Sequence, residues 1–147
     1  MNPLLKAAAA GVVGAVTTNV AHELTRRIVP DAPRVDVLGM QALAKSLTAT
    51  TGTTPTGDGL YGATLVGDLV SNSAYFSAVG FGGGNALAVG LGLGVLAGLG
   101  AVVLPPRMGL DEKPTARTPT TEALTVALYT AGGLAAGMAY QALGADD

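Results

Sequence analysis

Apolar residues are gathered into four long stretches of this chain, at about residues 4–24, 60–79, 85–104 and 121–143. Each is close to the ~20 residues that a helix rising about 1.5 Å per residue needs to cross ~30 Å of hydrocarbon. From Leu69 to Pro106 the sequence has no Asp, Glu, Lys or Arg, whereas a small soluble domain needs ionised side chains along each element. The pattern predicts an all-α fold, an integral membrane four-helix bundle that residues 1–147 form as a single domain.

The connections indicate how these helices follow one another. Residues 80–84 join the second and third stretches, and so short a connection requires the two helices to be antiparallel neighbours. Pro105 and Pro106 are expected to stop the third helix, and Pro119 to begin the fourth. A signal peptide is the alternative interpretation of the first stretch, but residues 19–21 form a poor cleavage site.

The connection at about residues 29–59 is the only long one. Asp36 is expected to cap a short helix there, with an apolar face on one side and Gln41 and Lys45 on the other. The apolar face consists of Met40, Leu43, Ala44 and Leu47. This amphipathic pattern suits a helix lying on the membrane surface, or a helix folded over the end of the bundle.

Positive charge is distributed unevenly between the connections. Of the eight Lys and Arg residues, only Lys6 lies outside the connections that follow the first and third stretches. The positive-inside rule assigns those connections to the cytoplasm, so we expect a multi-pass protein of the cell (inner) membrane with both termini outside.

Composition agrees with a membrane environment and excludes several classes of protein. Mean hydropathy is +0.47 and only 12% of residues are charged, while the 22 glycines are tolerable inside packed membrane helices. A net charge of −2 with dispersed cations gives no footprint for nucleic-acid binding. The absence of cysteine removes disulfides and thiolate metal sites, no metal site is predicted, and no cofactor can be assigned.

The second apolar stretch also carries a polar stripe, whose members recur at spacings of three and four. They are Tyr61, Thr64, Asp68, Ser71, Asn72 and Tyr75. Lipid does not tolerate such a face, so it must point at protein or water. Asp68 is the central member, because an ionisable group at that depth costs several kcal/mol unless it is paired or hydrated.

Polar residues on the first and fourth stretches could meet this stripe. If these faces converge, an intramembrane polar site forms from Asp68, Asn72, Ser71, Tyr129, His22 and Glu23. Such a cluster could bind a cation or proton, or it could simply lock the register of the helices through hydrogen bonds. The sequence leaves both interpretations open.

Small residues recur at every fourth position of the third stretch, a spacing that lets helix backbones approach closely in lipid. The predicted packing residues are Ala86, Gly90, Gly94 and Gly98, with Gly133 and Gly137 of the fourth stretch as partners within one subunit or across an oligomer.

Three classes of function remain. The first is an oligomeric transporter or channel with its polar site around Asp68. The second is a scaffold or accessory subunit that packs against a membrane-protein partner through its small-residue faces. The third is an enzyme acting on lipid or quinone, which is disfavoured because the sequence has one histidine, no nucleophile motif and no assignable catalytic residue.

Overall fold

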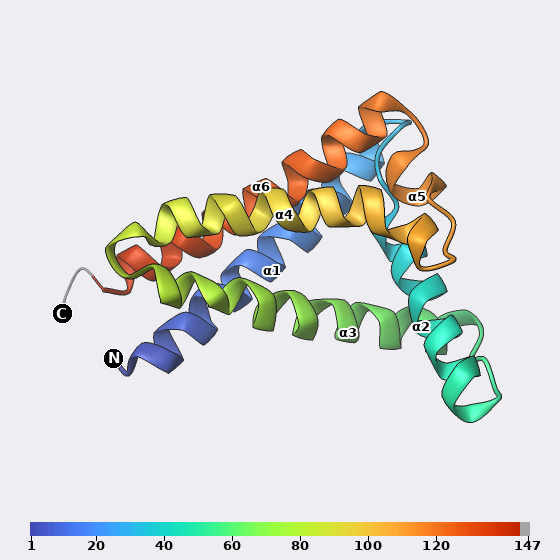
Figure 1. The fold of residues 1–147 in the computed structure, drawn as a ribbon, viewed down its shortest axis with the longest axis horizontal. Helices are drawn as coiled ribbons and strands as arrows, with labels where there is room; N and C mark the ends of the chain where they lie inside the picture. The colour runs from blue at the N-terminus through green and yellow to red at the C-terminus, as the bar shows by residue number, and fades with distance from the viewer. Residues whose placement is uncertain (145–147) are drawn as a thin grey trace.

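The computed structural model describes residues 1–144, which form six α-helices and one 3-10 helix and contain no strand (Figure 1). The all-α prediction is therefore confirmed at the level of class. The elements are α1 (Pro3–Ile28), α2 (Val35–Thr51), α3 (Gly57–Phe76), η1 (Ser77–Asn85), α4 (Ala86–Arg107), α5 (Lys113–Ala116) and α6 (Pro119–Ala142).

Three of these helices, α1, α4 and α6, are long and apolar enough to cross a membrane. This supports a membrane-embedded protein, but the predicted four-helix membrane bundle is not confirmed. The second expected span, residues 60–79, corresponds to α3. This helix is long enough to cross a membrane, but it is not among the helices that are also apolar enough to do so. Its polar stripe, with Asp58 and Asp68, lowers its hydropathy below that of α1, α4 and α6.

The helices pack unevenly. α6 lies along both α4 and α1, and α1 also packs against α3. α3 and α4 are antiparallel as expected, yet they diverge from η1 and make few contacts with each other beyond that junction (Figure 1). Near the junction the Tyr75 hydroxyl donates a hydrogen bond of 2.9 Å to the Leu93 carbonyl. The two helices thus form a wedge that is closed at η1 and open at the end where α2 lies.

The closest backbone contact is between α4 and α6. A Cβ atom at Gly94 would lie 2.6 Å from the Thr130 Cα, and one at Gly137 would lie 2.7 Å from the Ala86 carbonyl oxygen. The Gly90 and Gly133 backbones face each other in the same way. All six small residues singled out in the sequence, which include Gly98, therefore lie in one interface within a single chain.

The two prolines do not stop α4. The helix continues through Pro105 and Pro106 to Arg107. A proline removes one helical hydrogen bond, and here a side chain from α5 supplies the missing donor. Pro119 does begin α6, and the Thr118 side chain caps that helix by accepting from the Thr121 amide.

The long connection contains α2, which is a longer helix than the sequence indicated. Asp36 is not its cap; Arg34 occupies that position without a capping side chain, and Asp36 bonds to arginines instead. The Lys45 ammonium donates to the Met108 carbonyl at 2.5 Å, and the Gln41 side chain accepts from the Asp111 amide. These contacts hold α2 across the end of the bundle.

The two ends of the molecule differ in the number of basic residues that they carry. The beginning of α1 and the end of α6 lie together, with the Lys6 ammonium 4.5 Å from the centre of the Tyr140 ring. α2 and α5 lie at the opposite end (Figure 1), and the other seven Lys and Arg residues belong to the elements of that end.

Candidate functional site

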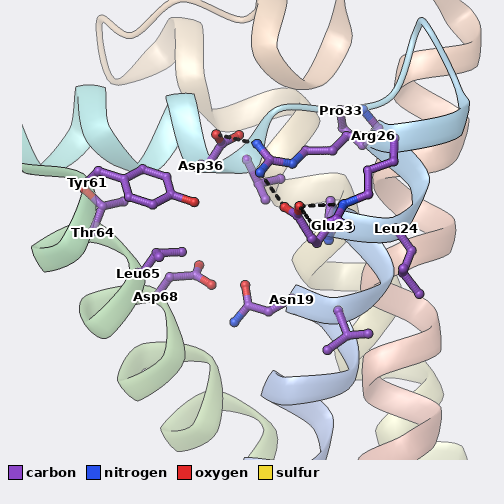
Figure 2. Close-up of a pocket in the computed structure, with 14 residues that line it drawn as sticks. Asn19, Glu23, Leu24, Arg26, Pro33, Asp36, Tyr61, Thr64, Leu65 and Asp68 are labelled. Atoms are coloured by element: carbon purple, nitrogen blue, oxygen red, sulfur yellow. Dashed lines mark hydrogen bonds and ion pairs between the residues drawn. The ribbon is translucent and has the colours of Figure 1, made fainter. Parts of the chain in front are cut away.

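A cavity of about 420 Å³ lies between α1 and α3, beneath the first turn of α2 (Figure 2). It exists because α1 and α3 touch at one end only. Near η1 they are in close contact, since a Cβ at Gly11 would collide with Ser73 and Ser77 of the other segment. Toward α2 the two helices separate. The polar lining is formed by Asn19, His22, Glu23, Arg26, Arg27, Asp36, Tyr61, Thr64 and Asp68.

Asp68 lies at the inner end of this cavity. Its Oδ1 accepts a hydrogen bond of 3.0 Å from the Asn72 amide, and the Asn19 side chain is a second hydrogen-bond partner. Figure 2 shows the Asn19 and Asp68 side chains pointing toward each other across the gap between their helices. Within residues 1–144 no Lys or Arg forms an ion pair with Asp68. The carboxyl group is therefore held by neutral amides.

His22 is buried behind the same cavity wall, with 5% of its surface exposed. Its Nδ1 lies 2.9 Å from the Thr18 carbonyl oxygen, which can only accept, so Nδ1 carries the ring hydrogen. Nε2 is then a hydrogen-bond acceptor, and it has no partner among the described residues. The ring packs edge-on against Tyr129 with the centroids 5.3 Å apart, and Tyr129 in turn lies within electrostatic range of Asp68.

An ionic network surrounds the mouth of the cavity. Arg26 bridges Glu23 and Asp36, and the Arg34 guanidinium holds Asp36 through two hydrogen bonds of 2.9 and 2.8 Å. Burial raises the pKa of Asp36, but the hydrogen bonds and charge of Arg34, together with Arg26, outweigh burial and hold that pKa below its ordinary value. Asp36 is therefore ionised at neutral pH.

A second cavity, of about 590 Å³, fills the wedge between α3 and α4. Asp68, Asn72, Ser71 and Tyr129 line it, so Asp68 borders both cavities, which follow one another along the polar face of α3. The Ser71 hydroxyl donates to the backbone carbonyl of Asp68 rather than to its carboxyl group.

The structure does not bring the six predicted site residues into a single cluster. Asp68, Asn72 and Tyr129 line the second cavity, with His22 packed against Tyr129; Glu23 belongs to the ionic network, and Ser71 lies beside Asp68 on the second cavity with its hydroxyl turned to the backbone. Sequence reasoning missed the role of Arg34 and Asp36. Their i, i+2 spacing is the available signal, whereas the sequence pattern predicts only that Asp36 caps a helix.

The described residues contain no group of three or more His, Cys, Asp or Glu side chains that could hold a metal ion. Comparison of the chain with protein-family models, curated proteins and solved structures finds no match. A functional assignment therefore depends on the geometry of the site alone.

Proposed function

We propose that this chain is a small membrane transporter or channel in which Asp68 binds a proton or a small cation. One observation carries the proposal: the Asp68 carboxyl group has only amide partners and borders two cavities inside an apolar helical protein. An ionised carboxylate in such surroundings is costly unless a cation or water compensates its charge. Proton uptake or cation binding removes that cost, which makes Asp68 the place where a positive charge is taken up.

The neighbouring groups suit either occupant. The amide of Asn72 donates to the charged carboxylate, and by turning it can accept a hydrogen bond from the protonated form. The oxygens of Asn19 and Thr64 line the approach and can replace part of the hydration shell of a cation. Glu23 and Asp36 at the mouth are each paired with two arginines, so the attraction for a cation comes from Asp68.

Transport, rather than binding alone, is supported by the position of Asp68 where two cavities meet. The α1–α3 cavity and the α3–α4 cavity follow one another along the polar face of α3, and Asp68 lines both. We further propose a homo-oligomer in the cell (inner) membrane, with α2 and α5 cytoplasmic and both termini outside, as the distribution of cations favours.

The scaffold alternative loses much of its basis. It required the small-residue face of α4 to pack against a partner, but α6 of the same chain occupies that face. Asp68 as a purely structural lock is the alternative that the experiment below separates from the proposed function.

The test is flux through liposomes that contain the purified full-length chain, measured for protons, Na⁺ and K⁺, with Asp68→Asn as the variant. Asp58→Asn is the matched control, since Asp58 is an exposed aspartate at the start of the same helix. We expect Asp68→Asn to abolish flux while its helix content and unfolding temperature stay near wild type, and Asp58→Asn to behave as wild type.

Two results contradict the proposal. Wild-type protein that passes none of these ions under any gradient excludes transport. A variant Asp68→Asn that unfolds readily but conducts normally when folded identifies Asp68 as a structural lock.

A further inference from the structure

Another cavity of about 420 Å³ lies beside the last turn of α1 and is lined by four arginines. It shares Glu23, Arg26 and Arg27 with the α1–α3 cavity. Arg26 and Arg27 come from α1, Arg34 from the connection before α2, and Arg117 from the connection between α5 and α6. Glu23 is the only acidic residue in the lining. Four guanidinium groups from three segments therefore converge on one cavity with a single carboxylate.

Acidic residues outside this cavity hold three of the arginines in place, one of them being Arg26 through Asp36. Arg117 donates to Asp31 at 3.0 Å and to the Pro30 carbonyl at 3.1 Å, and Arg34 is held by Asp36. Neither Asp31 nor Asp36 lines the cavity. These contacts orient the guanidinium groups without filling the space between them.

The connection that carries Arg34 is fixed by backbone contacts. The Arg34 amide donates to the Pro114 carbonyl at 2.7 Å, and the Asp31 carbonyl accepts from the Thr121 hydroxyl at 2.9 Å. A site whose donors are already positioned loses less conformational entropy when it binds a ligand. The arginine cavity is preorganised in this sense.

The arginines also retain hydrogen-bonding capacity. A guanidinium has five N–H donors, and within residues 1–144 the only side-chain partner of Arg27 is Glu23. The side chains of Arg27 and Arg117 are 68% and 49% exposed, so their remaining donors are accessible. Arginine forks match the paired oxygens of phosphate, and the bonds that they form are among the stronger ones in proteins.

The position of the cavity favours a particular source of phosphate. α1 ends at Ile28 and α6 begins at Pro119, and both helices are apolar enough to cross a membrane. The arginine cavity therefore lies where these helices leave the hydrocarbon, at the level of lipid headgroups. Positive clusters at this depth attract anionic lipids.

We propose that the arginine cavity binds a phosphate group, supplied by the headgroup of an anionic phospholipid. The proposal is independent of ion transport at Asp68, because Asp68 does not line this cavity. Arg27 and Arg117 carry the test, since Arg26 and Arg34 also hold Asp36 in the ionic network at the other cavity.

The experiment is a calorimetric titration of the full-length chain in a nonionic detergent. The ligands are dioctanoyl phosphatidic acid, dioctanoyl phosphatidylcholine and inorganic phosphate, and the variants are Arg27→Gln and Arg117→Gln. Arg107→Gln is the matched control, because Arg107 is an exposed arginine at the same end of the molecule and lies outside the cavity. Circular dichroism verifies that each variant is folded.

We expect phosphatidic acid to bind more tightly than phosphatidylcholine, and each cavity variant to weaken that binding about tenfold through loss of a charge-assisted hydrogen bond. Arg107→Gln should bind as wild type. Binding of inorganic phosphate with the same dependence on Arg27 and Arg117 also supports the phosphate site and adds a soluble source. Equal affinity for the two lipids, no binding at all, or an equal loss in Arg107→Gln overturns the proposal.

Discussion

The Thr115 hydroxyl donates a hydrogen bond of 2.6 Å to the carbonyl oxygen of Ala101. Ala101 lies four residues before Pro105, so its carbonyl is the one that the proline leaves without a helical partner. Thr115 is completely buried, and its own carbonyl accepts a hydrogen bond from Thr125. This residue of α5 thereby joins the end of α4 to the beginning of α6.

Thr115→Val should therefore destabilise the protein. The substitution keeps the shape of the side chain but leaves the part-buried Ala101 carbonyl unpaired, at a cost of about 1–3 kcal/mol. Thermal unfolding in detergent measures the effect, with Thr115→Ser expected near wild type. Thr120→Val, at an exposed threonine, is the control; an equal loss in both valine variants would disprove this role for the hydroxyl.

The interface between α4 and α6 permits a second comparison of variants. A Cβ at Gly94 would lie 2.6 Å from both the Thr130 Cα and the Tyr129 carbonyl oxygen, whereas one at Gly92 would meet open space. Gly94→Ala should thus separate the helices and cost about 1–3 kcal/mol of unfolding free energy. Gly92→Ala should leave stability unchanged or raise it slightly, because alanine favours the helix. Similar unfolding temperatures for the two variants would show that the helices do not pack this closely.

Acid should weaken the attachment of α2 to the end of α1. Because the folded-state pKa of Asp36 lies below its ordinary value, its ionised form stabilises the fold above the unfolded-state pKa of about 4. That contribution is lost as the pH falls through the folded-state pKa.

Asp36→Asn should remove this part of the acid dependence and lower stability at neutral pH by about 1 kcal/mol, a modest value because Arg34 is half exposed. Unfolding free energy measured between pH 7 and pH 3 checks the prediction. Asp58→Asn serves as the reference, and an unchanged acid dependence in Asp36→Asn would refute it.

The helices were predictable because their signals are local. Length and apolarity are properties of a single segment, so α1, α4 and α6 were located to within a few residues. The C-terminal end of α4 was not predicted, since the continuation past Pro105 depends on Thr115, which is distant in sequence. The divergence of α3 from α4 was not predictable either, because it depends on the path of η1 and on the space that α1 and α6 fill.

In the candidate site, too, local contacts were predictable from the sequence and contacts between helices were not. The bond from Asn72 to Asp68 follows from their i, i+4 spacing on one helix. The contact between His22 and Tyr129 and the approach of Asn19 to Asp68 require three helices to meet at a particular rotation. The arginine cavity could not be foreseen either, because Arg34 and Arg117 are brought together by a connection whose path only tertiary contacts determine.

Both cavities beside Asp68 share α3 as a wall, and α3 is joined closely to the rest of the protein only near η1, while α2 braces its far end. The residues of α3 that line these cavities belong to one polar face, and Asp68 lies where the two linings meet. A change in the tilt of α3 would therefore reshape both cavities together and move the carboxyl group with them.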